Sequence, residues 1–207
     1  MSTRMPIQKR SIEKRDRIIK LGFELMCNNG YFNTNTNDIA KYADVSTGIV
    51  YQYFNDKKEI FIEGFKEYSN SIMFPILDII KNNKINFDNV EELLDTMLNL
   101  FIKKHTLSKK AHEEMIALTH MDSDIADIYH KNEIQVTNMI VDILKSNDIC
   151  SDNLFEKVHI IIGIVENYCH EIVYHKHESI NYDVMKDEVI NTICYLLDKK
   201  DIKFENS

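Results

Sequence analysis

The chain has 207 residues, of which 44% are hydrophobic, enough for one compact body or for a small domain joined to a larger one. Five glycines and two prolines are too few for the tight turns that a strand-rich fold needs. No apolar run approaches the roughly 18 residues of a membrane span, and no apolar leader is visible, so we expect a cytoplasmic protein without a membrane partner. Four scattered cysteines fit buried thiols in a reducing compartment.

The net charge of −8 is unevenly distributed. Residues 1–58 carry 10 Lys or Arg and 6 Asp or Glu, a net charge of +4, whereas residues 59–207 carry a net charge of −12. A basic segment joined to an acidic body is typical of a DNA-binding domain attached to a domain that does not bind DNA. Chance clustering of cations between Arg4 and Lys20 would look the same, so charge alone does not decide.

The first part of the chain predicts a flexible basic arm over residues 1–10, followed by three helices. The first helix covers about 11–29 and ends at Gly30, which we expect to adopt the left-handed cap conformation. Two short helices follow, at about 36–43 and 47–54, joined by a tight turn.

The rest of the chain predicts further amphipathic helices. A long helix begins near Lys57, and we expect Pro75 to end or kink it. The other helices are expected at 89–106, 108–118, 123–146, 152–176 and 182–199. No strand pattern competes with them, so the predicted fold class is all-α.

The two short helices have the features of a helix-turn-helix. Ala40 and Ala43 keep the inner face of the first helix small, so that the second helix can cross it closely, and Val45 fills the crossing. Ser46 is the expected N-cap of the second helix, whose first residues would enter the major groove of DNA. The pattern therefore favours a DNA-binding domain.

This segment resembles the signature of the TetR family of transcriptional regulators. The resemblance covers about residues 12–72, roughly a third of the chain, with ungapped spacing. It rests on Gly30, Tyr31, Phe32, Thr34, Asp38, Ile39, Ala40, Ala43, Val45, Ser46, Gly48, Tyr51, Tyr53, Phe54, Lys57, Glu59 and Phe61. It implies a three-helix DNA-binding domain over 11–56 and a helical ligand-binding and dimerisation domain over 57–207.

The resemblance also implies a set of DNA contacts. They are Thr36, Ser46, Thr47, Gly48, Tyr51, Gln52, Tyr53 and Lys57. Gly48 would allow close approach to the bases, and the Gln52 amide can contact adenine bidentately, whereas the others would hold phosphates. Many family members have a cation at the position of Thr47 and a glycine at that of Asp44. Because helix 47–54 carries no cation, the basic arm is expected to compensate. Outside this pattern, such aromatic residues would be interpreted as core and Lys57 as a solvated charge.

The last two predicted helices carry apolar residues on more than one face, which indicates that each of them packs against two neighbouring helices. With their symmetry mates they would form a four-helix bundle that holds two DNA-binding domains about 34 Å apart, or a multiple of that, on a pseudo-palindromic operator. The candidate residues of this homodimer interface are Val158, Ile162, Val165, Cys169, Ile172, Val189, Ile193 and Leu196. A monomeric bundle core is the alternative.

The helices between are rich in Met and aromatic residues, which can line an adaptable apolar pocket and can equally form plain core. The candidate ligand-binding residues are Phe65, Tyr68, Met97, Phe101, His112, Met115, His120 and Asn167. In the family, a ligand here shifts the population of domain spacings so that operator binding is lost. We therefore expect a repressor released by a small apolar or cationic effector.

Several alternatives share part of this pattern. A regulator whose ligand enhances DNA binding, or an activator, has the same sequence features. A helical enzyme, or a binding protein without a DNA function, is more distant, because no Gly-rich phosphate loop or nucleophile elbow is present. Glu166, His170, His175 and His177 are close in sequence, but no HExxH or Cys/His pair accompanies them, so we expect no metal and no cofactor.

Overall fold

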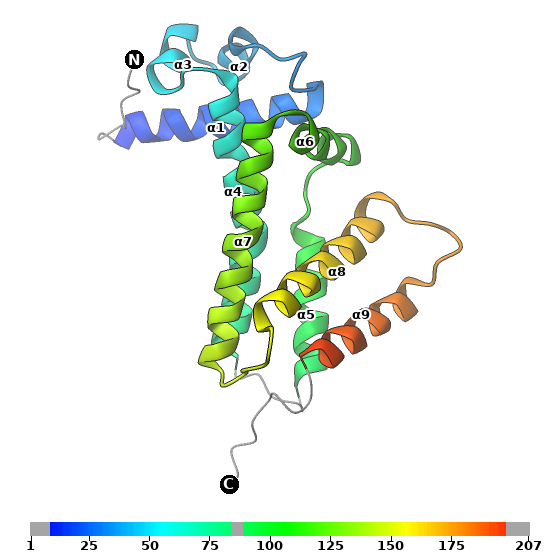
Figure 1. Ribbon diagram of the computed structural model, residues 1–207. Helices are drawn as coiled ribbons and strands as arrows, with labels where there is room; N and C mark the ends of the chain where they lie inside the picture. The colour runs from blue at the N-terminus through cyan, green and yellow to red at the C-terminus, as the bar shows by residue number, and fades with distance from the viewer. Residues whose placement is uncertain (1–8, 84–88, 198–207) are drawn as a thin grey trace. The chain divides into compact units, whose positions relative to one another are not determined.

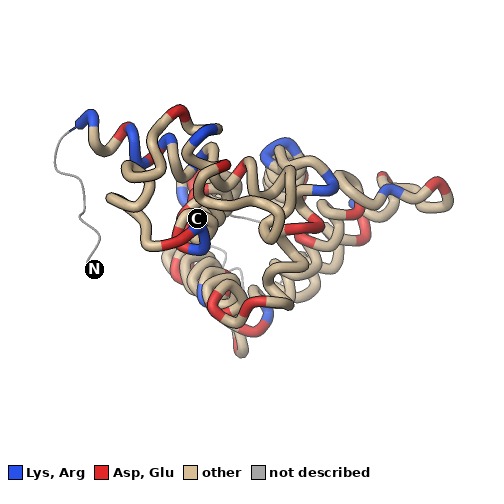
Figure 2. Tube along the Cα trace, turned by 90° about the horizontal axis from the view of Figure 1, so that it is seen from above, with Lys and Arg blue, Asp and Glu red and all other residues tan. Residues whose placement is uncertain are grey.

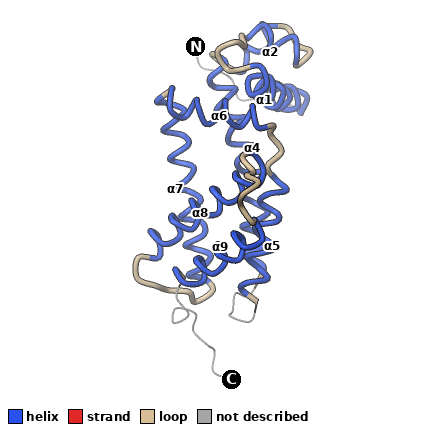
Figure 3. Tube along the Cα trace, turned by 90° about the vertical axis from the view of Figure 1, so that its right-hand side faces the viewer, coloured by secondary structure: helices blue, strands red, loops and turns tan. Residues whose placement is uncertain are grey.

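The computed structural model describes residues 9–83 and 89–197. Within these residues the chain forms nine α-helices and no strand (Figures 1 and 3), which confirms the predicted all-α class. The helices are α1 (Lys9–Asn29), α2 (Thr36–Tyr42), α3 (Thr47–Tyr53), α4 (Lys57–Asn82), α5 (Val90–Lys104), α6 (Lys109–Met121), α7 (Ser123–Ser146), α8 (Leu154–Tyr174) and α9 (Tyr182–Leu196). None of the described helices is long and apolar enough to cross a membrane.

The arm predicted over 1–10 lies outside the described residues up to residue 8, and its last two residues belong to α1. Of the two outcomes expected at Pro75, an end of the helix is wrong, because α4 continues through Pro75 to Asn82, whereas a kink stays a prediction. Ile72 and Ile76 are buried on either side of this proline. Such packing keeps a helix together where proline removes one backbone donor.

The described residues group into two compact units. Unit 1 takes its residues from Met1–Asn70 and Leu107–Tyr129, and unit 2 from Ser71–Thr106 and His130–Ser207. Helices α4 and α7 therefore contribute residues to both units. Unit 1 therefore includes residues 57–70 and 107–129, which were expected in the second domain.

In unit 1, α1 packs against α2, α3 and α6. The predicted apolar face of α1 is buried, with Ile18, Ile19 and Met26 inaccessible to solvent. Burying side chains of this size stabilises the fold by about 1.5 to 3 kcal/mol each. Gly30 ends α1 at φ 98°, the left-handed conformation expected of it.

Two glycines allow α1 and α4 to cross closely. A Cβ at Gly22 would lie 2.8 Å from Ile60 Cγ2, and a Cβ at Gly64 would overlap Cβ and Cγ of Phe23. The Phe23 ring lies 5.3 Å from that of Phe61 and is buried. Side-chain rotation cannot move the Phe23 Cβ away, so the crossing requires glycine at position 64.

Gly64→Ala should therefore destabilise the protein. The expected loss is about 1 to 3 kcal/mol of unfolding free energy, the cost of overpacking a dense core. Gly48→Ala is the matched control, because Gly48 is also helical but a Cβ there would meet only Ser46 Oγ at 3.9 Å. The control should leave stability unchanged or raise it by up to about 1 kcal/mol. Urea denaturation measures both, and equal stability of the two variants would contradict the close crossing.

Candidate nucleic-acid interface and ligand cavity

The turn between α2 and α3 is built from local hydrogen bonds. Asn35 caps α2 and forms a capping box with Asp38, whose carboxylate accepts from the Asn35 N–H at 3.0 Å. Asp44 adopts φ 52° in the turn, a conformation that Asp tolerates better than most residues other than Gly. The Arg17 guanidinium of α1 donates to the Asp44 carbonyl at 3.1 Å, a long-range contact that the sequence pattern does not reveal.

The predicted scaffold of the helix-turn-helix is present. Ala40 and Ala43 of the first helix are buried, and the Val45 N–H donates to the Ala40 carbonyl at 2.9 Å. Ser46 caps α3 and accepts from the Ile49 N–H. The inner face of α3 is likewise buried, so this helix is fixed on one side and free on the other.

The outer face of α3 carries most of the predicted DNA contacts. Ser46, Gly48, Tyr51 and Gln52 are exposed, Tyr51 to 55%. Thr47 is partly buried, and its hydroxyl donates to Asn37 Oδ1 at 2.8 Å. Thr36, in the first turn of α2, is also partly accessible.

Tyr53 is the exception among these residues. It is only 8% exposed, and its hydroxyl lies 2.6 Å from Ser11 Oγ in a hydrogen bond between α3 and α1. Its ring packs edge-on against Phe54 at 6.5 Å. The structure therefore places Tyr53 in the core rather than on the DNA-facing surface, because its position on α3 faces α1.

Lys57, which was expected to hold a phosphate, binds groups of the protein instead. Its ammonium donates to the backbone carbonyls of Tyr31 at 2.6 Å and Thr34 at 2.8 Å, and lies 4.4 Å from the centre of the Tyr31 ring. Burial lowers the pKa of Lys57. Two of its three N–H donors thus hold the loop that leads into α2.

The cations missing from α3 are present on α1. Figure 2 shows Lys and Arg recurring along the helix that follows the N-terminus. The exposed ones are Lys9, Arg10, Lys14, Arg17 and Lys20. Since α1 packs against α3, these cations lie on a helix next to the uncharged α3.

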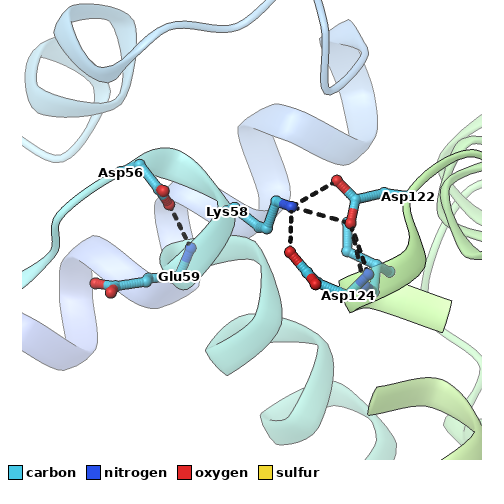
Figure 4. A network of polar contacts seen from close by, with 6 residues as sticks. Asp56, Lys58, Glu59, Asp122 and Asp124 are labelled. Atoms are coloured by element: carbon cyan, nitrogen blue, oxygen red, sulfur yellow. Dashed lines mark hydrogen bonds and ion pairs between the residues drawn. The ribbon is translucent and has the colours of Figure 1, made fainter. Parts of the chain in front are cut away.

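A second charged group in unit 1 joins the start of α4 to the junction of α6 and α7 (Figure 4). Lys58 Nζ lies 2.8 Å from Asp122 Oδ2 and 2.7 Å from Asp124 Oδ2. Asp122 also accepts from the N–H groups of Asp124 and Ile125 as α7 begins. The Lys58 hydrogen bond keeps the pKa of Asp122 below its ordinary value, and both carboxylates raise the pKa of Lys58.

Lys58→Met should lower the unfolding free energy at pH 7 by about 0.5 to 1 kcal/mol, the range of partly exposed ion pairs. Because the pKa of Asp122 is depressed in the folded state, this stabilisation is present above its ordinary value of 3.8 and disappears as the pH falls through the folded value. Urea titrations at pH 7 and pH 3 measure the difference. Lys66→Met is the control, because the pair that Lys66 makes among the described residues is with Glu63 of the same helix, at 3.7 Å. Equal effects of both substitutions at pH 7 would contradict a special role for Lys58.

Unit 2 encloses a cavity of about 110 Å³. Its lining residues come from α4, α5, α7, α8 and α9, with the last position following α9. They are Met73, Ile76, Ile80, Val90, Leu93, Leu94, Met97, Leu98, Phe101, Ile140, Leu144, Val158, Ile161, Ile162, Val165, Glu166, Ile193 and Leu197. The chemistry of this set suits an apolar ligand.

Two of the eight predicted ligand residues, Met97 and Phe101, line this cavity. The others lie elsewhere. The members that pack in unit 1, buried or partly buried, are Phe65, Tyr68, His112 and Met115. His120 and Asn167 are exposed. Met and aromatic residues mark apolar surroundings equally well in a core and in a cavity, so the sequence could not separate them.

The residues predicted for the dimer interface do not lie on one exposed surface. The four that line the cavity are Val158, Ile162, Val165 and Ile193. Cys169 and Val189 are buried, and Ile172 and Leu196 are partly buried. The large apolar residues that α8 and α9 leave exposed are instead Ile160, Val184 and Tyr195, at 52%, 54% and 83%. Sequence reasoning missed them because both helices are apolar on several sides.

The histidines of α8 make no metal site among the described residues, in which no group of three or more His, Cys, Asp or Glu is placed to hold an ion. The His170 ring lies 5.1 Å from that of His105 and 5.8 Å from that of Tyr174. His177 lies 3.6 Å from the Glu171 carboxylate near the end of the helix. These contacts place His170 and His177 among aromatic and acidic side chains near the C-terminal end of α8.

Helices α1, α2 and α3 of unit 1 have the arrangement of a helix-turn-helix domain, in which α3 packs against α2 and leaves its outer face exposed. Residues 18–63 match the model of the family described as bacterial regulatory proteins, tetR family. This match confirms the predicted resemblance of the N-terminal segment to the tetR family.

Two similar proteins are named as regulators. The chain is 46% identical over 48 residues to the HTH-type transcriptional regulator HbdR of Aromatoleum sp. (strain CIB), and 28% identical over 100 residues to the fatty acid metabolism regulator protein of Bacillus subtilis (strain 168). These matches cover 23% and 48% of the chain, which spans 21% and 52% of the lengths of the two relatives. Both relatives are named as regulators, which agrees with the expectation that the chain is not an enzyme.

The fold is shared more widely than the sequence. A crystal structure described as a TetR-family transcriptional regulator from Mesorhizobium loti has a TM-score of 0.71 and 14% identity, and covers 92% of this chain and 98% of the other. At this identity the likeness concerns the fold of the chain and not its ligand.

Proposed function

We propose that the protein is a homodimeric transcriptional repressor that binds operator DNA through α2 and α3 and is released by a small molecule bound in the cavity of unit 2. The observation that carries the DNA-binding part is the division of α3 into two faces. Val50 and Phe54 anchor the helix in the core, while Tyr51 and Gln52 remain exposed on the other side. A helix held in this way can enter the major groove.

Each group at this surface has a distinct proposed role. The start of α3, at Ser46 and Gly48, is accessible to a phosphate and to the edges of the bases. Tyr51 would contact the backbone, and Gln52 would read adenine. Lys57 would act indirectly, because its ammonium group binds two carbonyls of the loop before α2 and so positions Thr36. The cations of α1 supply the charge that α3 lacks.

Two substitutions test the interface. An operator is first obtained by selection from random duplex DNA with the wild-type protein, and affinities are then measured by fluorescence anisotropy. Tyr51→Ala should weaken binding about tenfold on all sequences, whereas Gln52→Ala should relax the preference at one base pair, worth about 1 to 3 kcal/mol. Gln135→Ala, at an exposed position of α7, is the control and should change nothing. Wild-type affinity and specificity in both test variants would refute the assignment.

The proposed dimer uses the exposed apolar side of α8 and α9, two helices that pack against each other. Ile160, Val184 and Tyr195 supply the apolar groups, and a Cβ at Gly163 would meet no atom within 4 Å. A glycine on an open helix face allows a partner helix to approach closely. Two copies that bury this face against each other would place two α3 helices on one operator.

Ile160→Arg should convert the dimer into a monomer. Burying an arginine between two apolar faces leaves its charge unpaired, so the variant should sediment at 24.4 kDa where the wild type sediments at twice this mass. Ile134→Arg is the matched control, because Ile134 is a similarly exposed isoleucine on α7. A wild-type protein that is monomeric at micromolar concentration, or an Ile160→Arg variant that remains dimeric, would rule out this interface.

The regulatory part of the proposal depends on α4. This helix lines the cavity with Met73, Ile76 and Ile80, and its first turn carries Lys57 and Lys58 in unit 1. A ligand that favours one position of α4 would therefore favour one arrangement of the DNA-binding helices. The names of the relatives support a regulator and say nothing of this chain's effector.

A further inference from the structure

We propose that Asn37 of α2 is a base-reading residue of the DNA-binding surface, and that the Thr47 hydroxyl restricts it to guanine. This inference rests on the proposed DNA-binding function and adds a specificity residue to it. It starts from one contact between the two helices of the helix-turn-helix, in which the Thr47 hydroxyl donates to Asn37 Oδ1 at 2.8 Å. The two residues are ten positions apart, and the sequence pattern predicts no such pair.

The contact places the Asn37 side chain beside the start of α3. Thr47 is the first residue of α3, and the first residues of such a helix are those that contact base edges in the major groove. Asn37 itself is exposed, in the first turn of α2. Its backbone N–H donates to Asn35 Oδ1 at 2.9 Å, which fixes the main chain from which the side chain extends. Asn37 is therefore held at the surface that is proposed to face DNA.

The same hydrogen bond decides which polar groups are left for DNA. A threonine hydroxyl has one O–H donor, and Thr47 uses it on Asn37. The phosphate contact expected of Thr47 would need that donor, because phosphate oxygens only accept. On Asn37 the bond directs the amide oxygen toward Thr47 and leaves both N–H groups of Nδ2, for which no acceptor is placed among the described residues. The pair therefore offers DNA two donors from one nitrogen.

The bases differ in the donors and acceptors that they present in the major groove. Guanine presents two acceptors, O6 and N7, whereas adenine presents the N7 acceptor beside the N6 donor. An amide that offers both its oxygen and its nitrogen matches adenine, as is proposed for the exposed Gln52. Asn37 offers donors alone, so guanine is the matching base. Thymine presents one acceptor and cytosine a donor, so both match less well.

Two substitutions test this role on the operator selected by the wild-type protein. Affinities of the full-length protein are measured by fluorescence anisotropy for the operator and for every single base-pair change in it. Asn37→Ala should abolish a preference for guanine of about tenfold at one base pair of each half-site, a different base pair from the one that Gln52→Ala affects.

Thr47→Val gives the sharper result, because it keeps the shape of the side chain and removes the hydroxyl. Asn37 then regains its amide oxygen, so the preferred base at the same position should change from guanine to adenine. The double variant should behave as Asn37→Ala does, since the hydroxyl acts through the amide.

Two polar residues outside the helix-turn-helix provide matched controls. Asn138 of α7 and Thr119 of α6 bond to carbonyls of their own helices at 2.9 and 2.7 Å. Asn138→Ala and Thr119→Val should therefore keep the wild-type preference at every base pair. Far-UV circular dichroism and thermal melting of all variants show whether they fold as the wild type does. Asn37→Ala and Thr47→Val each decide the question alone, so a folding defect in one leaves the other as the test.

Several results would overturn the inference. Weaker binding of Thr47→Val to all sequences alike, with unchanged base preferences, would mean that the hydroxyl holds a phosphate. Unchanged base preferences of Asn37→Ala would exclude Asn37 as a base-reading residue. In both cases the wild type still selects an operator, so the proposed function stands and this inference alone fails. A wild type that selects no operator would refute the proposed function, and this inference with it.

Discussion

The crossing of α1 over α4 controls the geometry of unit 1. Because Gly64 has no side chain, Phe23 can lie directly against α4 and bring its ring to Phe61, whose ring in turn contacts Tyr31 at 5.5 Å. From the same stretch of α4, Lys57 holds the carbonyls of the loop that leads into α2. The orientation of α2 and α3 therefore follows from a few ångströms of packing at the crossing.

Local features of unit 1 could be predicted from the sequence, and long-range contacts could not. The caps at Gly30 and Ser46 and the small residues between α2 and α3 depend on neighbours within a few positions, and all were correctly expected. Tyr53 was misplaced because its position relative to α1 depends on how three helices pack. The partners of Lys58 lie 64 and 66 residues away, where no spacing rule connects them.

Unit 2 shows a different limit. The predicted helices are present, but α8 is apolar on several sides, so its sequence cannot say which stripe faces the cavity and which remains exposed. Val158 and Ile162 were expected at a subunit interface and line the cavity instead, whereas Ile160 between them is exposed. In the sequence, Glu166 is distinguished only by its spacing of four residues from His170. Only the packed structure shows that it lines an apolar space.

The central claim is that the outer face of α3 is the surface that contacts DNA. Hydrogen–deuterium exchange of the wild-type protein, with and without the DNA selected by it, tests this most directly, because it needs no substitution and reports every segment at once. The account predicts that DNA slows exchange over residues 35–38 and 46–52 and leaves residues 109–121 unchanged. Unchanged exchange over 46–52 in the presence of bound DNA, with protection elsewhere, would contradict it.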